Sequence, residues 1–282
     1  MYRWLFIAVL TLWLVAMAAL IRRDVWPAWT AQDVPRIQST QFEQAKREEQ
    51  FGIFDAQRQR IGTAWSDVQR EANGHTSLNG TVLIDGLKLL PPVRFESATE
   101  FDTEGELDSF RLDVYGVPMI ITVHGERRGI YFPCELQVGP MTRQANLDVS
   151  ASRMIGESLR PFTVLPKLRV GQSWRMQILD PFSAIQSRKA EFKSVIAQVT
   201  GRESIPIEGK GQVECFVVQI RDQGSMAWVA DDGQVLRQEV AVPGMKKLTL
   251  EIEPYDLKAR HQARDRVRIM TRRERGPYGS GH

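Results

Sequence analysis

The chain has 282 residues, of which 43% are hydrophobic and 25% are charged, and its formal net charge is +3. This composition suffices for one large or two small folded cores, and it excludes a largely disordered chain and a protein with many membrane spans. From Asp256 to His282 there are eight Lys or Arg against three Asp or Glu, a local +5, which leaves −2 for the other residues. A basic surface is therefore predicted only for the C-terminal end.

The first 24 residues predict a membrane anchor. Trp4–Ile21 is an 18-residue run with Thr11 as its only polar member, and at 1.5 Å per residue such a helix is about 27 Å long, close to the thickness of a bilayer core. A cleaved signal peptide is the alternative, because Ala16-Met17-Ala18 has the form of a cleavage site. We favour an uncleaved, single transmembrane helix because the apolar run continues past that site and ends on Arg22-Arg23.

The charges beside this helix favour a cytoplasmic body, since Arg22, Arg23 and Arg36 follow it and Arg3 precedes it. The difference is small, and a β-rich body behind an N-terminal anchor is typical of an exported domain. We therefore expect a single-pass protein of the cytoplasmic membrane with a periplasmic body.

Residues 25–50 predict a juxtamembrane spacer. Pro27 and Pro35 interrupt it, and Gln41–Gln50 is a polar stretch with helical character and too few apolar residues to bury a face. Such a segment holds the body away from the membrane.

Residues 51–255 predict a mainly β domain, a curved antiparallel sheet with a few short helices. Lys247–Glu253 alternates apolar and polar residues without exception, as a strand with one core face does. Asp232-Gly233 is a hairpin signal between two strands. A helix is predicted over Ala151–Leu159, where Pro161 stops it. The clearest strands are Val199–Ile205, Gln212–Arg221, Met226–Ala230, Gln234–Val242 and Lys247–Ile252.

Several turn glycines and strand tryptophans carry a family resemblance. They lie in Phe51-Gly-Ile-Phe54 with Ile61-Gly-Thr63, in a long hairpin through Gly105, in Val170-Gly-Gln-Ser-Trp174, in Val199–Glu203 and in the hairpin from Trp228 through Gly233 to Val235. Over about residues 51–254 this order resembles uncharacterised bacterial exported proteins related to the lipoprotein-carrier (LolA/LolB-like) half-barrel group. The resemblance implies a curved sheet around an apolar concave surface that receives acyl chains. The chain departs from that group by having one evident helix in its body and no lipidation Cys near its anchor.

The apolar faces of two strands are the predicted ligand-binding wall. A half-barrel lined by apolar side chains offers a hollow to a lipid or another apolar ligand, whereas the same faces packed against other side chains would be core only. The residues of this wall are Phe216, Val218, Ile220, Leu236 and Val240.

Catalytic and metal-binding patterns are weak. No Cys or His pair has the spacing of zinc ligands, so no metal and no cofactor is expected. His124 at a strand end and Cys134 on the next strand are a conceivable nucleophile pair, without a visible third group. Cys134 and Cys215 allow one disulfide, but both lie in apolar strands, where a free Cys packs as a small hydrophobe.

An acidic group surrounds one hairpin turn. Paired carboxylates can hydrolyse glycosides only when they face each other across a cleft, and a calcium loop needs a longer series of ligands. A solvated turn is the simpler interpretation. The group consists of Glu96, Glu100, Asp102, Glu104, Glu106 and Asp108.

Residues 256–282 predict a basic, disordered tail. A basic amphipathic helix on an anionic membrane surface is the alternative, because Ala263, Val267 and Met270 would share one face. Nucleic-acid binding is disfavoured, since no aromatic platform accompanies the arginines. The candidate membrane-surface residues are Arg264, Arg266, Arg268, Arg272 and Arg273.

The sequence thus favours a membrane-anchored, non-enzymatic domain that binds a lipid or apolar ligand or assists an envelope transport complex. A protein-interaction or scaffold domain with a filled core is the alternative. A hydrolase that uses His124 or the acidic hairpin is a third hypothesis, behind both.

Overall fold

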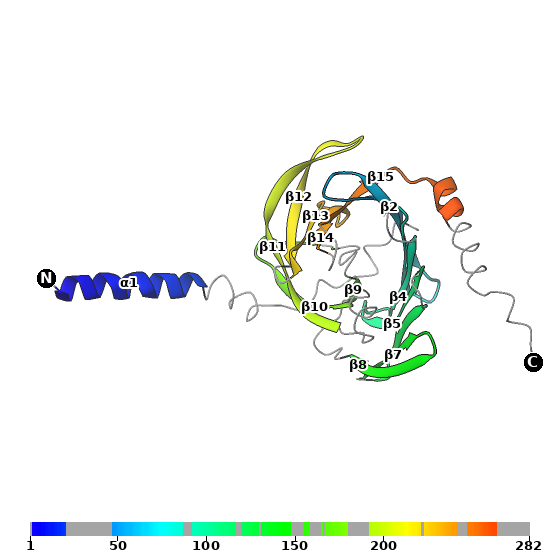
Figure 1. Ribbon diagram of the computed structural model, residues 1–282, viewed down its shortest axis with the longest axis horizontal. Helices are drawn as coiled ribbons and strands as arrows, with labels where there is room; N and C mark the ends of the chain where they lie inside the picture. The colour runs from blue at the N-terminus through cyan, green and yellow to red at the C-terminus, as the bar shows by residue number, and fades with distance from the viewer. Residues whose placement is uncertain are drawn as a thin grey trace, which may run out of the picture.

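The computed structural model describes residues 2–20, 47–86, 92–116, 120–129, 131–147, 155–157, 165, 167–179, 192–220, 223–241 and 247–263. In this part the chain is mainly β, with one large, curved and open sheet (Figure 1). The strands lie in the order β8-β7-β6-β5-β4-β3-β2-β1-β15-β14-β13-β12-β11-β10-β9. Consecutive strands are thus neighbours in the sheet, except β8 and β9, which lie at its two open edges, and β1 also pairs with β15.

The helix α1 is Tyr2–Leu20, and a second, short helix comprises residues 257–263. All strand pairs are antiparallel except β9 with β10. The strands are β1 Arg47–Phe54, β2 Arg60–Arg70, β3 Thr76–Ile84, β4 Val93–Phe101, β5 Leu107–Tyr115, β6 Ile121–Glu126, β7 Phe132–Val138, β8 Met141–Leu147, β9 Ile155–Glu157, β10 Ser173–Leu179, β11 Phe192–Ile207, β12 Gly211–Ile220, β13 Ser225–Val229, β14 Val235–Val240 and β15 Leu248–Glu253.

The first and last strands along the chain, β1 and β15, pair in the middle of the sheet, at what is here called the seam. Phe51 of β1 lies opposite Ile252 of β15, and Arg60 donates to both carboxylate oxygens of Glu253, at 2.7 and 2.8 Å. These two residues are 193 positions apart in the sequence. The seam is therefore a non-local contact, which forms only when both ends of the body have folded.

The concave face of the sheet carries the apolar core. Side chains alternate between the faces of a strand, so cross-strand partners share a face. One row across β2–β7 is buried throughout, and it consists of Ala64, Val82, Phe95, Val114, Ile121 and Val138. A second apolar cluster on β10–β14 includes Trp174, Val199 and Val218, and Leu165 and Leu168 pack against it.

The predicted β architecture is confirmed as a large antiparallel, open, curved sheet. The five strands expected between Val199 and Ile252 correspond to β11–β15 with shifted ends. Two helical predictions are wrong in the residues that the structure describes. Ile155–Glu157, inside the predicted helix Ala151–Leu159, is the strand β9, which pairs with β10. Arg47–Gln50, inside the predicted polar helix Gln41–Gln50, belongs to β1, because its pairing with β2 and β15 outweighs local helix propensity.

The N-terminal segment is helical, as predicted. α1 has 19 residues, and side chains such as Phe6, Leu12 and Trp13 are exposed. Among the described residues, no helix combines the length and the apolar character that crossing a membrane requires. The predicted transmembrane helix over Trp4–Ile21 is therefore not found. Ile21 and the spacer up to Lys46 lie outside the described residues.

A candidate outer cleft

The predicted apolar wall is divided between three packed clusters. Val218 and Ile220 are fully buried among the β10–β14 residues, and Phe216 packs at their margin. Leu236 belongs to a separate cluster with Trp228 and Cys215, and Val240 to the core of β1–β7. The structure therefore does not gather these five residues around one shared hollow.

Phe216 has a neighbour that the strand pattern did not suggest. The guanidinium carbon of Arg202 lies 4.4 Å from the centre of its ring, a cation–π contact across β11 and β12. Arg202 also pairs with Glu214 at 2.9 Å and with Asp231 at 2.7 Å. This half-buried aromatic ring is thus covered by a charged side chain.

His124 and Cys134 lie on opposite faces of the sheet. Cys134 is the cross-strand partner of Gly125, the residue after His124 on β6, and it is buried while His124 is exposed. A Cys–His nucleophile pair is therefore excluded by strand geometry. Cys215 lies in a different cluster, and the two thiols are not joined in a disulfide. Burial is the largest cause that raises the pKa of the Cys215 thiol, and Asp231 adds to it.

The acidic hairpin stabilises its own turn. The carboxylate oxygen Oδ1 of Asp102 accepts hydrogen bonds from the backbone N–H of Glu104 and Glu106, at 2.9 and 2.8 Å. Arg127 lies 2.8 Å from Glu106 and 3.6 Å from Asp102. Asp102 thus caps the turn, and Asp102 and Glu106 are ion-pair partners of Arg127.

The predicted tail begins as an ordered helix. Residues 257–263 are helical, and the Oδ1 atom of Asp256 caps them by accepting hydrogen bonds from the N–H groups of Lys258 and Ala259. Ala259 and Ala263, one turn apart, pack against Trp65 and Leu83 of the sheet. The predicted disorder from Asp256 onward is thus wrong for residues 257–263. The five candidate membrane-surface arginines, from Arg264 to Arg273, lie outside the described residues.

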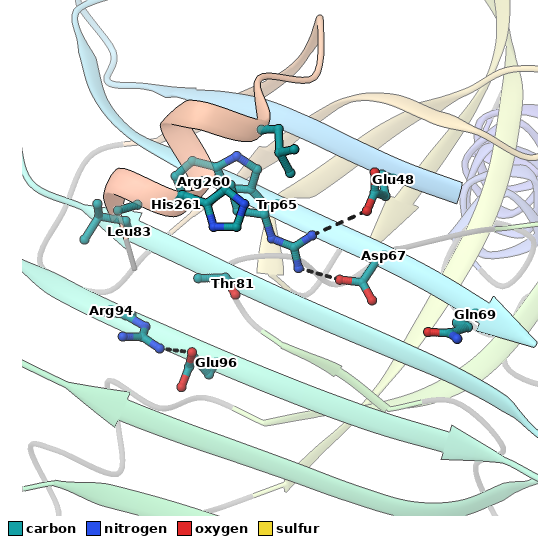
Figure 2. A pocket seen from close by; sticks show the side chains of 12 residues that line it. Glu48, Trp65, Asp67, Gln69, Thr81, Leu83, Arg94, Glu96, Arg260 and His261 are labelled. Carbon is teal, nitrogen blue, oxygen red and sulfur yellow. Dashed lines mark hydrogen bonds and ion pairs between the residues drawn. The ribbon is translucent and has the colours of Figure 1, made fainter. Parts of the chain in front are cut away.

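The short helix and the convex face of the sheet enclose a hollow of about 440 Å³, here called the outer cleft (Figure 2). In Figure 1 this helix lies outside the curve of the sheet, and it contacts side chains that alternate with the core row. The cleft is lined by Glu48, Trp65, Asp67, Gln69, Thr81, Leu83, Arg94, Glu96, Leu257, Arg260, His261 and Ala263.

Gln50 joins the helix, the floor of the outer cleft and the seam. Its Oε1 atom accepts hydrogen bonds from the Trp65 indole Nε1–H and from the Asp256 backbone N–H, both at 3.0 Å. Its Nε2 atom donates to Glu253 at 3.3 Å. Because Gln50 is 5% exposed, these bonds replace contacts with water that its amide group has lost.

Arg260 holds the helix against β2. Its Nη2 atom lies 2.6 Å from Asp67 Oδ1, and its Nη1 atom donates to the Tyr255 hydroxyl at 2.9 Å. Burial by itself would lower the pKa of Arg260, but the hydrogen bonds to Tyr255 and Asp67 more than compensate and the pKa is raised. Asn79 donates to the other oxygen of Asp67 at 3.1 Å.

The lower wall of the outer cleft carries a second ion pair, Arg94 with Glu96 on β4. Figure 2 shows this pair below Thr81, while the His261 ring lies beside Arg260 on the helix side. Chemically, the cleft combines charged groups, hydrogen-bonding groups and an apolar floor of Trp65 and Leu83. This mixture is typical of sites that bind small ligands or single side chains of a partner.

Sequence reasoning did not identify the outer cleft. In the sequence, Glu96 belongs to the acidic hairpin and Ala263 to the basic tail, and neither pattern indicates a shared site. The one available signal was Asp256, a helix-capping residue after Pro254 and ahead of alanines spaced four residues apart. Among the described residues, no group of three or more His, Cys, Asp or Glu is arranged to hold a metal ion.

Comparison with known proteins assigns no family to the chain. No family model and no curated protein matches the chain. A solved structure of a β-barrel-like protein of domain of unknown function DUF1849 from Brucella abortus is similar over 75% of this chain and 98% of that chain, at 11% identity and a TM-score of 0.46. A DUF1089 family protein from Pseudomonas aeruginosa is similar over 64% of this chain and 90% of that chain, at 14% identity and a TM-score of 0.36. The resemblance to the lipoprotein-carrier group is not shown by these matches.

Proposed function

We propose that the β body is a non-enzymatic binding domain that recognises a ligand or partner in the outer cleft. The observation that carries the proposal is the hollow of about 440 Å³ between the capped helix and β1–β4. Its volume falls in the range of small-molecule sites, roughly 300–1,000 Å³. Its lining includes polar groups held in defined positions by Gln50, Asp67 and Arg260.

The packing of the predicted wall residues favours the outer cleft over an apolar carrier site. Four of the five predicted wall residues, all except Phe216, are 0–1% exposed and already contact other side chains. A lipid would have to displace that packing, whereas the outer cleft is open in the folded chain. The interaction-domain hypothesis, with its filled core, is therefore preferred.

The test follows a fluorine label on Trp65 while small organic fragments are added. The full chain is labelled with 5-fluorotryptophan, and the Trp65 signal is assigned with the variant Trp65→Phe. Thr81→Trp fills the hollow, and Thr142→Trp, on the exposed surface of β8, is the matched control. We expect some fragments to shift the Trp65 signal in the wild type and in Thr142→Trp, but not in Thr81→Trp. A Trp65 signal that no fragment moves at millimolar concentration contradicts the proposal.

A second candidate is the apolar ligand predicted from the sequence, and one observation favours it. The Trp174 side chain is fully buried in the concave cluster, and its indole Nε1–H has no hydrogen-bond acceptor among the residues that the structure describes. A buried donor without an acceptor costs about 1–3 kcal/mol. A lipid ester or another apolar ligand with a carbonyl oxygen would supply the acceptor there.

Native mass spectrometry of the detergent-extracted full chain tests this candidate. We expect an added mass on the wild type and a lower occupancy in Trp174→Phe, which keeps an aromatic ring but lacks the N–H group. A wild type without any added mass argues against the apolar ligand. Reporter fusions after His282 test the predicted location of the body outside the cytoplasm, and attachment to a membrane or an envelope transport complex stays a prediction.

A further inference from the structure

We infer that the outer cleft selects an organic cation, a ligand with an ammonium or guanidinium group on a small apolar body. This inference rests on the proposed function of the cleft and adds the chemical class of its ligand. It follows from the charges of the lining, from their accessibility and from the floor between them.

The lining of the outer cleft carries more negative than positive charge. Three carboxylates, Glu48, Asp67 and Glu96, face the hollow together with two guanidinium groups, and His261 completes the titratable set. The three carboxylates and the two guanidinium groups together carry a net charge of −1. A site with surplus negative charge favours a cationic ligand and repels a phosphate or carboxylate.

The charged groups of the lining differ in how accessible they are to a ligand. Arg94 is paired with Glu96, and its guanidinium carbon lies 5.3 Å from the centre of the Tyr115 ring. The Arg94 side chain is 13% exposed, against 35% for Glu96. A ligand that enters this side of the cleft therefore meets the carboxylate before it meets the guanidinium group.

The opposite wall is balanced in charge. Arg260 is engaged by Asp67 and by the Tyr255 hydroxyl, and both Asp67 oxygens accept hydrogen bonds. Glu48 lies 3.8 Å from Arg260 Nη1, and the side chains of Glu48 and Arg260 are about equally exposed, at 28% and 29%. Glu96 is thus the most exposed charged side chain of the ion pairs that line the hollow, and it is negative.

The floor of the outer cleft is apolar. Trp65, Leu83 and Ala263 form one apolar cluster beneath the hollow, and Leu257 lies at its edge. Such a surface accommodates an aromatic or aliphatic body, and an aromatic ring also attracts a nearby cation. A bare metal ion would leave this floor unused, and an uncharged lipid would bury the carboxylates at a high desolvation cost. An amine or guanidine on an apolar body satisfies both parts.

The test uses benzylamine, benzyl alcohol and benzoate, which share a ring and differ in the charge of the head group. Binding to the full chain is followed by the fluorine signal of 5-fluorotryptophan at Trp65. We expect benzylamine to bind at least about fivefold more tightly than the other two, and less tightly at high salt. Glu48→Gln and Glu96→Gln should each weaken benzylamine roughly two- to fivefold, the range of partly exposed ion pairs.

Glu135→Gln is the matched control, because Glu135 is an exposed carboxylate of β7 outside the cleft, and it should leave the affinity unchanged. A blocked Gly-Gly-Arg-Gly-Gly peptide, with a Gln version as control, distinguishes a protein segment from a free amine as the source of the cation. Tighter binding of the Arg peptide than of benzylamine assigns a protein partner, and the reverse assigns a free amine.

Two outcomes overturn the inference and are distinguishable. If benzyl alcohol or benzoate shifts the Trp65 signal with equal or higher affinity, the cleft binds a ligand but does not select a cation, and the proposed function stands. If none of the probes and no fragment moves the Trp65 signal, the proposed function fails together with the inference.

Discussion

The concave and convex faces of β2–β4 differ in the chemistry of their side chains. On the concave face, Ala64, Val82 and Phe95 are buried partners in the core row. Their neighbours in the chain lie on the convex face, where Trp65, Thr81 and Glu96 line the outer cleft. The concave row is uniformly apolar, and the convex row is chemically mixed. A core needs only volume and apolarity, whereas a recognition site needs groups with different chemistry.

The largest loss of stability is expected from truncating a side chain on the concave face. Phe95 is 1% exposed in the core row, so Phe95→Ala should lower the free energy of unfolding by about 3–5 kcal/mol, because it leaves a cavity. Glu96→Gln, the next residue, should change it by less than about 1 kcal/mol, since its ion pair is partly exposed. Urea unfolding of both variants measures the difference, and equal losses would contradict the division of roles between the faces.

A smaller effect is expected where the two faces are connected. Gln50→Leu removes the acceptor of the Trp65 indole N–H and of the Asp256 N–H, and should lower stability by about 1–3 kcal/mol, because the buried indole N–H loses its partner. The helix 257–263 should also exchange its amide hydrogens faster. Hydrogen exchange with mass spectrometry checks this, with Gln59→Leu as control at an exposed glutamine. Unchanged exchange in the helix would show that Gln50 does not hold it.

The smallest effect concerns the thiol of Cys215. Burial raises its pKa, so the folded protein keeps its proton at a pH where the unfolded chain has lost it. Stability is therefore unaffected below the ordinary thiol pKa and falls as pH rises above it. The loss should be absent in Cys215→Ala, when unfolding is measured from neutral to alkaline pH. A slope that persists in this variant would assign the effect to other groups.

Local patterns sufficed for the strands and failed for the helices. Lys247–Glu253 and the Asp232-Gly233 turn have alternation and turn chemistry that do not depend on distant residues, and they appear as β15 and as the turn before β14. Ile155–Glu157 pairs with β10 instead of forming a helix. For so short a segment, hydrogen bonds to a neighbouring strand decide the conformation over local propensity.

The outer cleft had no local signature. Its lining comes from β1 to β4 and from the helix 257–263, and Arg260 lies 193 positions from Asp67. The predicted wall residues are divided between packed clusters for a related reason. Val218 and Leu236 each follow an apolar pattern in their own strand, yet a register shift between β13 and β14 separates their clusters.

The sequence by itself determined the class of this protein: a mainly β body of consecutive antiparallel strands, with a helical N-terminal segment and basic residues concentrated at the C-terminal end. Side-chain alternation and turn glycines act over a few residues, so they can be read from the chain directly. Only the tertiary structure decided that β1 pairs with β15, that Gln50 thereby meets Trp65 and Asp256, and that Arg260 reaches Asp67 to form the outer cleft. Those contacts join residues far apart in sequence, and they form only when the curved sheet brings its first and last strands together.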